Sequence, residues 1–140
     1  MRADLDHEAQ PDLVLIKTPG KGGQTQISAE DYIEGAPELV LEIVGSSSAY
    51  DLHQKKDAYR RNAVREYIAW ITGEKRVLWW ELRESEYIEI PRDGDGSLKS
   101  RVFPGLWLAS DPLIAGDMKA VLAGARCGLD SPEYRAFIAS

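Results

Sequence analysis

The amino-acid sequence predicts a mixed α/β fold, and three observations support this class. The first is a nearly continuous apolar run, Leu39–Val44, which is typical of a strand inside a sheet that is covered on both faces. The second is a Ser-rich turn at residues 45–48, followed by a helix that runs to about Asn62. The third is another buried-looking strand at residues 67–71, so that strand and helix patterns alternate along the chain. We find no internal repeat and no linker, and we expect a single domain over residues 1–140.

The elements before the first long strand are short. Residues 1–10 are polar and form an irregular lead-in, after which Pro11 introduces a β-rich run at residues 12–17. Residues 18–26 are rich in glycine and predict a loop. Residues 28–36 predict a helical turn that is capped by Ser28 and ends before Pro37.

The elements after the second strand alternate in the same way. Residues 76–82 and 87–90 predict an antiparallel hairpin around the sequence RESE, and residues 91–100 predict a loop. Residues 101–108 form an extended piece that Pro104-Gly105 interrupts. A helix is expected from Pro112 to about Arg126, and a final short helix is expected after Ser131 as its cap.

Composition excludes several classes of protein. The 140 residues carry a formal net charge of -6, which argues against a protein that coats nucleic acid without sequence preference. A cluster of carboxylates that holds Mg²⁺ raises the acidic count, so a nuclease stays open. Cys127 is the single cysteine, which excludes an internal disulfide framework and favours a reducing cytoplasm. The polar start is unlike a signal peptide, and no apolar run is long enough to cross a membrane.

The first candidate functional residue is Glu42, which interrupts the apolar strand. Side chains alternate along a strand, so Glu38, Val40, Glu42 and Val44 share one face. A buried charge is costly unless it is paired or holds a metal. Asp12 begins another strand, and carboxylates from two adjacent strands form the oxygen-rich pocket that Mg²⁺ prefers. For Asp12 taken alone, an exposed residue at the start of a strand is the alternative.

The second group of candidates lies on the helix that follows. Lys55 and Tyr59 are four residues apart and share a helical face, so Lys55 can point back towards the end of the Glu42 strand. The alternative for Lys55 is a solvated basic face. We assign that face to Lys56, Arg60 and Arg61, which could also contact phosphates.

Four segments taken together resemble a known family. They are PDLVLI, GAPELVLEIVGSSSAYDLHQKKDAY, AVREYIAW and FPGLWL, and in this order and spacing the chain resembles the Uma-two family of restriction endonucleases, from about Pro11 to Leu108. That family belongs to the PD-(D/E)XK nuclease superfamily. The resemblance implies a restriction-endonuclease-like mixed central sheet flanked by helices. It also implies hydrolysis of phosphodiester bonds in DNA with Mg²⁺ or Mn²⁺.

The resemblance also implies a metal site. Its Pro-Asp strand corresponds to Pro11-Asp12, which makes Asp12 the first ligand, and its strand glutamate corresponds to Glu42. Together with the backbone carbonyl of Ile43, these residues would hold one or two Mg²⁺ ions.

The superfamily's lysine has a different position here. Val44 stands where that lysine is expected, and the pattern D-x-x-x-K-x-x-x-Y on the next helix matches Asp51, Lys55 and Tyr59. The resemblance therefore implies that Lys55 orients the attacking water or neutralises the phosphate, and that Tyr59 braces Lys55. The position of Lys55 that we expected from the helical spacing agrees with this role.

Two departures from the family keep a second function open. Family members usually have a helix and a strand before the Pro-Asp strand, so we expect an N-terminally shortened domain. This expectation and Val44 favour the alternative of a catalytically inactive relative that acts as an interaction module for protein or nucleic acid. Whether the domain cuts DNA as a homodimer also stays open, although C2 dimers are the commonest oligomers.

Overall fold

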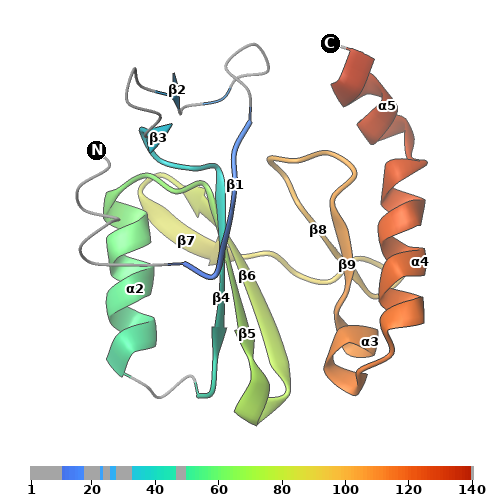
Figure 1. The fold of residues 1–140 in the computed structure, drawn as a ribbon, viewed down its shortest axis with the longest axis horizontal. Helices are drawn as coiled ribbons and strands as arrows, with labels where there is room; N and C mark the ends of the chain where they lie inside the picture. Colours follow the sequence, from blue (N-terminus) through green and yellow to red (C-terminus); the bar gives the residue numbers. More distant parts are fainter. Residues whose placement is uncertain (1–10, 18–22, 24–25, 28–32, 47–49, 140) are drawn as a thin grey trace. The chain divides into compact units, whose positions relative to one another are not determined.

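The computed structural model describes residues 11–17, 23, 26–27, 33–46 and 50–139. The chain divides into two compact units, residues 1–88 and residues 89–140. Figure 1 shows the elements of both units in the colours of the chain order.

The first unit contains a mixed sheet of five strands in the order β1-β4-β5-β6-β7. β4 and β5 run parallel, whereas β1 pairs antiparallel with β4 and β6 pairs antiparallel with β5. This confirms the predicted α/β class with a mixed sheet. The strands are β1 (Leu13–Leu15), β4 (Leu39–Val44), β5 (Glu66–Ile71), β6 (Arg76–Arg83) and β7 (Glu86–Glu89).

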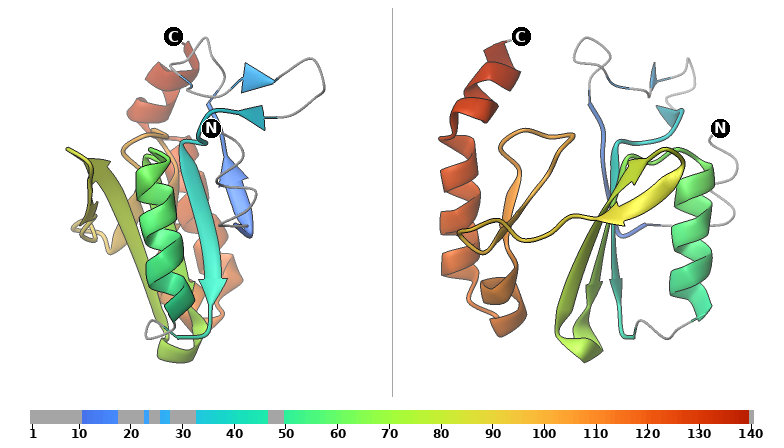
Figure 2. Two further views of the ribbon diagram at one scale, coloured as in Figure 1. Left: turned by 90° about the vertical axis from the view of Figure 1, so that its left-hand side faces the viewer. Right: turned by 180° about the vertical axis from the view of Figure 1, so that it is seen from behind.

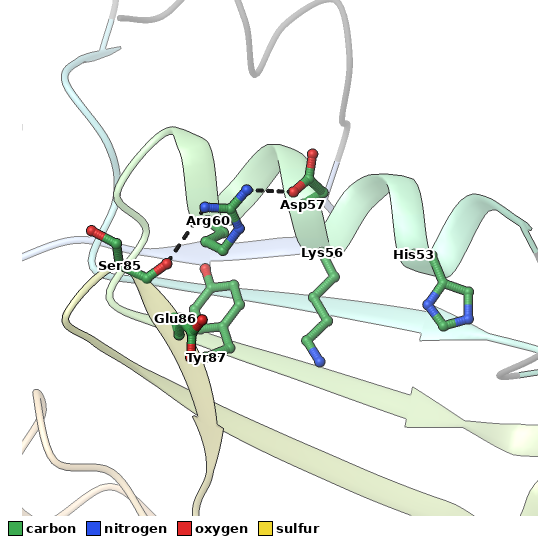
Figure 3. Close-up of a pocket in the computed structure, with 7 residues that line it drawn as sticks. All are labelled: His53, Lys56, Asp57, Arg60, Ser85, Glu86 and Tyr87. Atoms are coloured by element: carbon green, nitrogen blue, oxygen red, sulfur yellow. Dashed lines mark hydrogen bonds and ion pairs between the residues drawn. The ribbon is translucent and has the colours of Figure 1, made fainter.

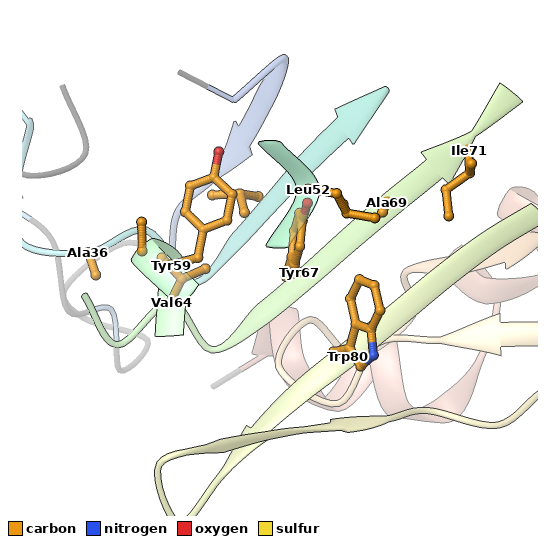
Figure 4. Close-up of a cluster of buried hydrophobic side chains, with 10 residues drawn as sticks. Ala36, Leu52, Tyr59, Val64, Tyr67, Ala69, Ile71 and Trp80 are labelled. Atoms are coloured by element: carbon orange, nitrogen blue, oxygen red, sulfur yellow. The ribbon is translucent and has the colours of Figure 1, made fainter. Parts of the chain in front are cut away.

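Helix α2 (Tyr50–Arg61) connects the two parallel strands and covers one face of the sheet, as Figure 2 shows from the side. Its apolar side chains, Leu52 and Ala58, pack with Tyr67 and Trp80 of the strands in one buried cluster (Figure 4). The register Val40↔Tyr67↔Trp80 places a large side chain of each strand in the row beneath the helix. The core of this unit therefore lies between α2 and the sheet.

The opposite face of the sheet is also largely buried. Leu39, Ile68 and Trp79 are all at most 4% exposed, and the indole nitrogen of Trp79 donates to Oε1 of the buried Glu66 at 3.1 Å. Ile43 departs from this pattern because it is 48% exposed. The prediction that β4 is covered on both faces therefore holds for its start and fails at Ile43.

The predicted hairpin is present and turns over two residues. β6 and β7 are neighbours in the sheet, and Glu84 and Ser85 between them have φ values of 49° and 68°. Such left-handed values at both central positions are those of a type I′ turn, whose twist matches that of the flanking strands.

Thr72–Glu74 forms a short 3-10 helix, η2, between β5 and β6.

The helical turn predicted for residues 28–36 is wrong at its end. Residues 28–32 lie outside the described part of the chain, but β3 (Ile33–Glu34) is a strand that pairs antiparallel with β2 (Gln26–Ile27). Each of these strands has only two residues, one apolar and one polar. A pattern this short does not distinguish a turn of helix from a strand.

The second unit pairs two short strands and carries three helices. β8 (Ser97–Lys99) and β9 (Trp107–Ala109) are antiparallel, and the helices are α3 (Ser110–Ala115), α4 (Met118–Leu129) and α5 (Pro132–Ala139). The residues predicted as a loop, 91–100, thus include the strand β8. Ser131 is confirmed as the cap of α5, because its Oγ accepts a hydrogen bond from the backbone nitrogen of Tyr134 at 3.3 Å.

The single helix predicted from Pro112 to about Arg126 is two helices. Gly116 ends α3 with φ at 80°, a left-handed conformation that glycine adopts without strain. Asp117 then begins α4, because its side chain accepts a hydrogen bond from the backbone nitrogen of Ala120 at 3.2 Å. The helical periodicity continues across this break, which is why the sequence alone did not separate the two helices.

Candidate active site

Glu42 is a buried carboxylate with two partners from α2. Its side chain is 2% exposed and lies in the sheet row beneath the helix, next to Ala69 of β5. Nζ of Lys55 lies 3.3 Å from its Oε2, and the hydroxyl of Tyr59 donates to its Oε1 at 2.5 Å. The charge that looked misplaced in an apolar strand is therefore neutralised and hydrogen-bonded.

The sequence dictates this arrangement locally. β4 presents every second side chain to α2, and α2 presents residues four apart to the sheet, so Lys55 and Tyr59 lie one turn apart above Glu42. Lys55 is 27% exposed, which puts the ion pair at the boundary between core and solvent. Removal of Lys55 alone would leave a buried charge without its counter-ion, a strongly destabilising change.

Tyr59 is held in its protonated form. Burial raises the pKa of its hydroxyl far above the ordinary value, and the hydrogen bond to Glu42 raises it further. A phenol that keeps its proton is a permanent hydrogen-bond donor, so Tyr59 fixes the position of the carboxylate. The sequence predicted that Tyr59 braces Lys55. In the structure both residues bind the same carboxylate, one at each oxygen.

Asp12 lies directly before β1, the strand that neighbours β4. Leu13 pairs with Leu41, so the residue before it comes next to Glu42 at the start of β1. The backbone nitrogen of Asp12 donates to the carbonyl of Leu41 at 3.0 Å, and its Oδ2 accepts from the backbone nitrogen of Ile43 at 2.7 Å. The negative charge of Asp12 also contributes to the raised pKa of Tyr59. The side chain is exposed, in contrast to Glu42.

These donors fit a hard divalent cation. Two carboxylates and a backbone carbonyl supply oxygen ligands, and Mg²⁺ is commonly held by one or two carboxylates with several waters. Within the described ranges no group of three or more His, Cys, Asp or Glu side chains could hold a metal ion. The site that the resemblance implies has only two such side chains, Asp12 and Glu42, together with the backbone carbonyl of Ile43. It is therefore compatible with that finding.

The predicted nucleic-acid-binding residues lie on another side of the helix. Lys56 and Arg60 line an open pocket of about 510 Å³ (Figure 3), together with His53, Asp57, Ser85, Glu86 and Tyr87. This pocket faces β7, whereas Lys55 and Tyr59 face Glu42 of β4. Residues of α2 thus take part in two separate surfaces.

The basic residues of this second surface have partners. Asp57 binds Nη2 of Arg60 at 2.6 Å and Nε of Arg61 at 3.1 Å, and these arginines, Arg60 foremost, hold the pKa of its carboxyl below the usual range. Nζ of Lys56 lies 4.2 Å from the centre of the Trp80 ring, a cation-π distance. Arg60 also donates to the carbonyl of Ser85 at 3.4 Å.

Parts of the Ser-rich turn and of the D-x-x-x-K-x-x-x-Y pattern lie outside the described residues. Ser48, at the Ser-rich turn, lies outside the described residues, and so does the side chain of Asp51. Because α2 begins at Tyr50, Asp51 lies inside its first turn.

Sequence reasoning missed one residue at this site, Tyr67. Its side chain is fully buried, and its ring contacts the ring of Tyr59 with centroids 5.0 Å apart. Burial and the charge of Glu42 both raise the pKa of its hydroxyl. The alternation of β5 was the available signal, because it places Tyr67 and Ala69 on the face that Glu42 shares.

The comparisons with known proteins give one family. No curated protein matches the chain. None of the helices in the described part of the molecule is long and apolar enough to cross a membrane. The model of the Uma2 family, described as “putative restriction endonuclease”, matches residues 1–111 of the 140. The match includes Asp12 directly before β1, Glu42 of β4 and Lys55 of α2. On this match, the chain belongs to the Uma2 family of nuclease-like proteins.

Proposed function

We propose that this chain is a metal-dependent endonuclease that hydrolyses phosphodiester bonds in DNA. The observation that carries the proposal is the buried carboxylate of Glu42, which an amine and a phenol hold from α2 while Asp12 lies beside it. A nuclease-like role agrees with the family. The metal, the substrate and the roles of individual residues are our inference from the resemblance to the family together with the geometry.

Asp12, Glu42 and the backbone carbonyl of Ile43 would hold Mg²⁺ or Mn²⁺. When bound, such an ion lowers the pKa of a coordinated water and stabilises the charge that develops on the phosphate. Tyr59 holds the Glu42 carboxylate in one orientation, and the bond from the Ile43 nitrogen does the same for Asp12. Two ligands are then fixed before any ion or substrate arrives, which lowers the cost of binding.

Lys55 would act on the substrate. Its ammonium sits on a flexible stem at the boundary with solvent, so it can reach from Glu42 towards a phosphate or the attacking water. There it would orient the water or neutralise negative charge on the phosphate. Lys56, Arg60 and Arg61 would contact the DNA backbone on the other side of α2, away from the reaction.

The compartment and the organisation of the chain belong to the same proposal. A single cysteine and the DNA substrate favour the cytoplasm. That residues 1–140 form a single domain stays a prediction, and whether the chain acts as a homodimer stays open.

The test is cleavage of supercoiled plasmid DNA with Mg²⁺ or Mn²⁺. We expect Glu42→Ala and Lys55→Ala to slow cleavage on the order of 100-fold or more, because the first removes a ligand of the metal ion and the second removes a positive charge at the reacting phosphate. Lys119→Ala, on α4, is the matched control for loss of a lysine, and it should cleave as the wild type does. Circular dichroism would establish that every variant is folded. Equal cleavage by all four proteins would remove the proposed roles.

One observation favours a second function, that of a catalytically inactive interaction module. Each oxygen of Glu42 already has a partner within the chain, as in a purely structural ion pair. Calorimetry with Mg²⁺ and Mn²⁺ separates the two functions. If neither ion binds and Glu42→Gln stabilises the fold, Glu42 is structural and the module is the better description.

A further inference from the structure

Tyr59 and Tyr67 bury their side chains on the same side of the sheet, but only the hydroxyl of Tyr59 has a hydrogen-bond partner in the described part of the chain. Tyr59 donates to Glu42, whereas the hydroxyl of Tyr67 makes no hydrogen bond within the described part of the chain. The side-chain oxygen of Asn62 is the other buried atom in this condition among the described residues. Burying a hydroxyl without a partner is unfavourable, and such groups in folded proteins call for an explanation.

The surroundings of Tyr67 hold its ring in place next to the active site. Tyr67 lies opposite Val40 in the register, two positions along from the pair of Glu42 and Ala69 and on the same face of the sheet. Its ring meets that of Tyr59 edge to face and stacks on Trp80, with centroids 5.0 and 5.2 Å apart. Figure 4 shows these three aromatic residues in one cluster. Tyr67 cannot turn its hydroxyl towards solvent, because its side chain is fully buried.

Glu42 has capacity for another donor. An ionised carboxylate can accept about four hydrogen bonds, and Glu42 accepts one from Lys55 and one from Tyr59. Tyr67 is an electrostatic neighbour, since the charge of Glu42 helps to raise the pKa of its hydroxyl. Tyr67 therefore keeps its proton and can donate it to an acceptor.

Lys55 is the partner that Glu42 would lose during function. A divalent cation at Glu42 would repel the ammonium group of Lys55, whose side chain is 27% exposed and so already reaches solvent. The carboxylate oxygen that Lys55 leaves can then accept a hydrogen bond from another donor.

We propose that Tyr67 is a positioning residue that donates a hydrogen bond to Glu42, directly or through one water, when Lys55 leaves the carboxylate. This inference rests on the proposed function, in which Lys55 serves the phosphate and Glu42 holds a divalent cation. The unpartnered hydroxyl lowers stability in the state with Lys55 in place, and that loss is offset in the working state. Such conflicts between stability and use are typical of functional sites.

The first test needs no metal and uses the full chain. Lys55→Met removes the partner that Tyr67 is proposed to replace. We expect Tyr67→Phe to leave the midpoint of urea unfolding unchanged or raised in the wild type. In the Lys55→Met background the same change should lower the midpoint, because the hydroxyl is then in use. Lys55→Gln serves if Lys55→Met does not fold. An effect of the same sign in both backgrounds would overturn the inference.

The second test measures the affinity for Mg²⁺ by calorimetry. We expect Tyr67→Phe to weaken Mg²⁺ binding about 10-fold, since one hydrogen bond to a charged ligand is lost. The matched control is Tyr87→Phe, whose hydroxyl in the same cluster donates to the carbonyl of Val64 at 2.7 Å. That variant should unfold more easily but keep the wild-type affinity. Equal affinity in Tyr67→Phe and wild type contradicts the inference.

The two hypotheses fail in different ways. A wild type that binds no Mg²⁺ defeats the proposed metal site, and the unfolding test still decides whether Tyr67 supports Glu42. A wild type that binds Mg²⁺ while Tyr67→Phe behaves normally in both tests defeats only the role of Tyr67.

Discussion

Buried Glu42 depends on its two neighbours, Lys55 and Tyr59, and the phenol is the one with no exposure to solvent. Tyr59→Phe keeps the ring and removes the donor, so that one carboxylate oxygen loses its hydrogen bond. We expect the free energy of unfolding to fall by about 1.5–3 kcal/mol, the range for a hydrogen bond to a charged group. Urea denaturation followed by tryptophan fluorescence would measure the change.

A double-mutant cycle identifies the partner of Tyr59. In a Glu42→Ala background the acceptor is absent, so Tyr59→Phe should cost much less than it does in the wild type. If the cost is the same in both backgrounds, the stabilising contact of Tyr59 is with some other group.

The sequence was sufficient to place Glu42, Lys55 and Tyr59 but not to show how they interact. Alternation along β4 and the four-residue spacing on α2 both follow from local geometry, so they can be read from the chain. Which oxygen each partner reaches depends on how far the helix lies above the sheet. The alternation of β5 could have placed Tyr67 on the face of Glu42, but its ring contact with Tyr59 could not be read from the sequence.

Among the elements, those with strong local signals were predicted with accurate bounds. β4 has five apolar residues out of six and lies between Pro37 and Gly45. Its predicted ends, Leu39 and Val44, agree with the structure. The break between α3 and α4 was missed because a glycine inside a helical pattern is often tolerated. The pair Gly116-Asp117 was nevertheless a readable signal, because glycine commonly ends a helix and aspartate commonly begins one.

Another glycine allows α4 to pack closely against the turn before β9. A Cβ at Gly128 would lie 2.2 Å from the carbonyl oxygen of Gly105 and 2.9 Å from Cγ of Trp107. Alanine normally stabilises a helix relative to glycine by about 1 kcal/mol. Here we expect Gly128→Ala to lower the free energy of unfolding by about 1–3 kcal/mol, because the backbones must move apart.

Gly94→Ala is the matched control for this substitution. A Cβ at Gly94 meets no atom within 4 Å, so the change should stay within about 0.5 kcal/mol of the wild type. Thermal unfolding of both variants under the same conditions would make the comparison. A Gly128→Ala protein that is as stable as Gly94→Ala would show that the turn and the helix do not approach closely in solution.

On the scale of the whole molecule, the charge limits how the chain can bind DNA. The formal net charge is -6, so attraction must come from a local group of cations. Lys56, Arg60 and Arg61 are the proposed phosphate contacts. Three contacts predict that the logarithm of the binding constant falls with the logarithm of salt concentration with a slope of about -2.7.

Fluorescence anisotropy with a labelled duplex, without divalent ions, would measure this slope. Lys56→Ala should reduce its magnitude by about 0.9, and Lys119→Ala should leave it unchanged. A slope near -6, or one that Lys56→Ala does not alter, would place the contacts elsewhere on the molecule.

The position of β1 at the edge of the sheet has a consequence for the proposed metal site. β1 has three residues, its side chains at Leu13 and Val14 are 48% and 38% exposed, and the main buried cluster of the described residues takes none of its members from β1. The edge can therefore open locally at a lower free energy than global unfolding requires. Asp12 would leave with it, whereas Glu42 and α2 would stay folded. If the ion binds as proposed, its affinity and the stability of the fold are governed by different equilibria, and we expect mutations in β1 to change the affinity while the stability stays nearly constant.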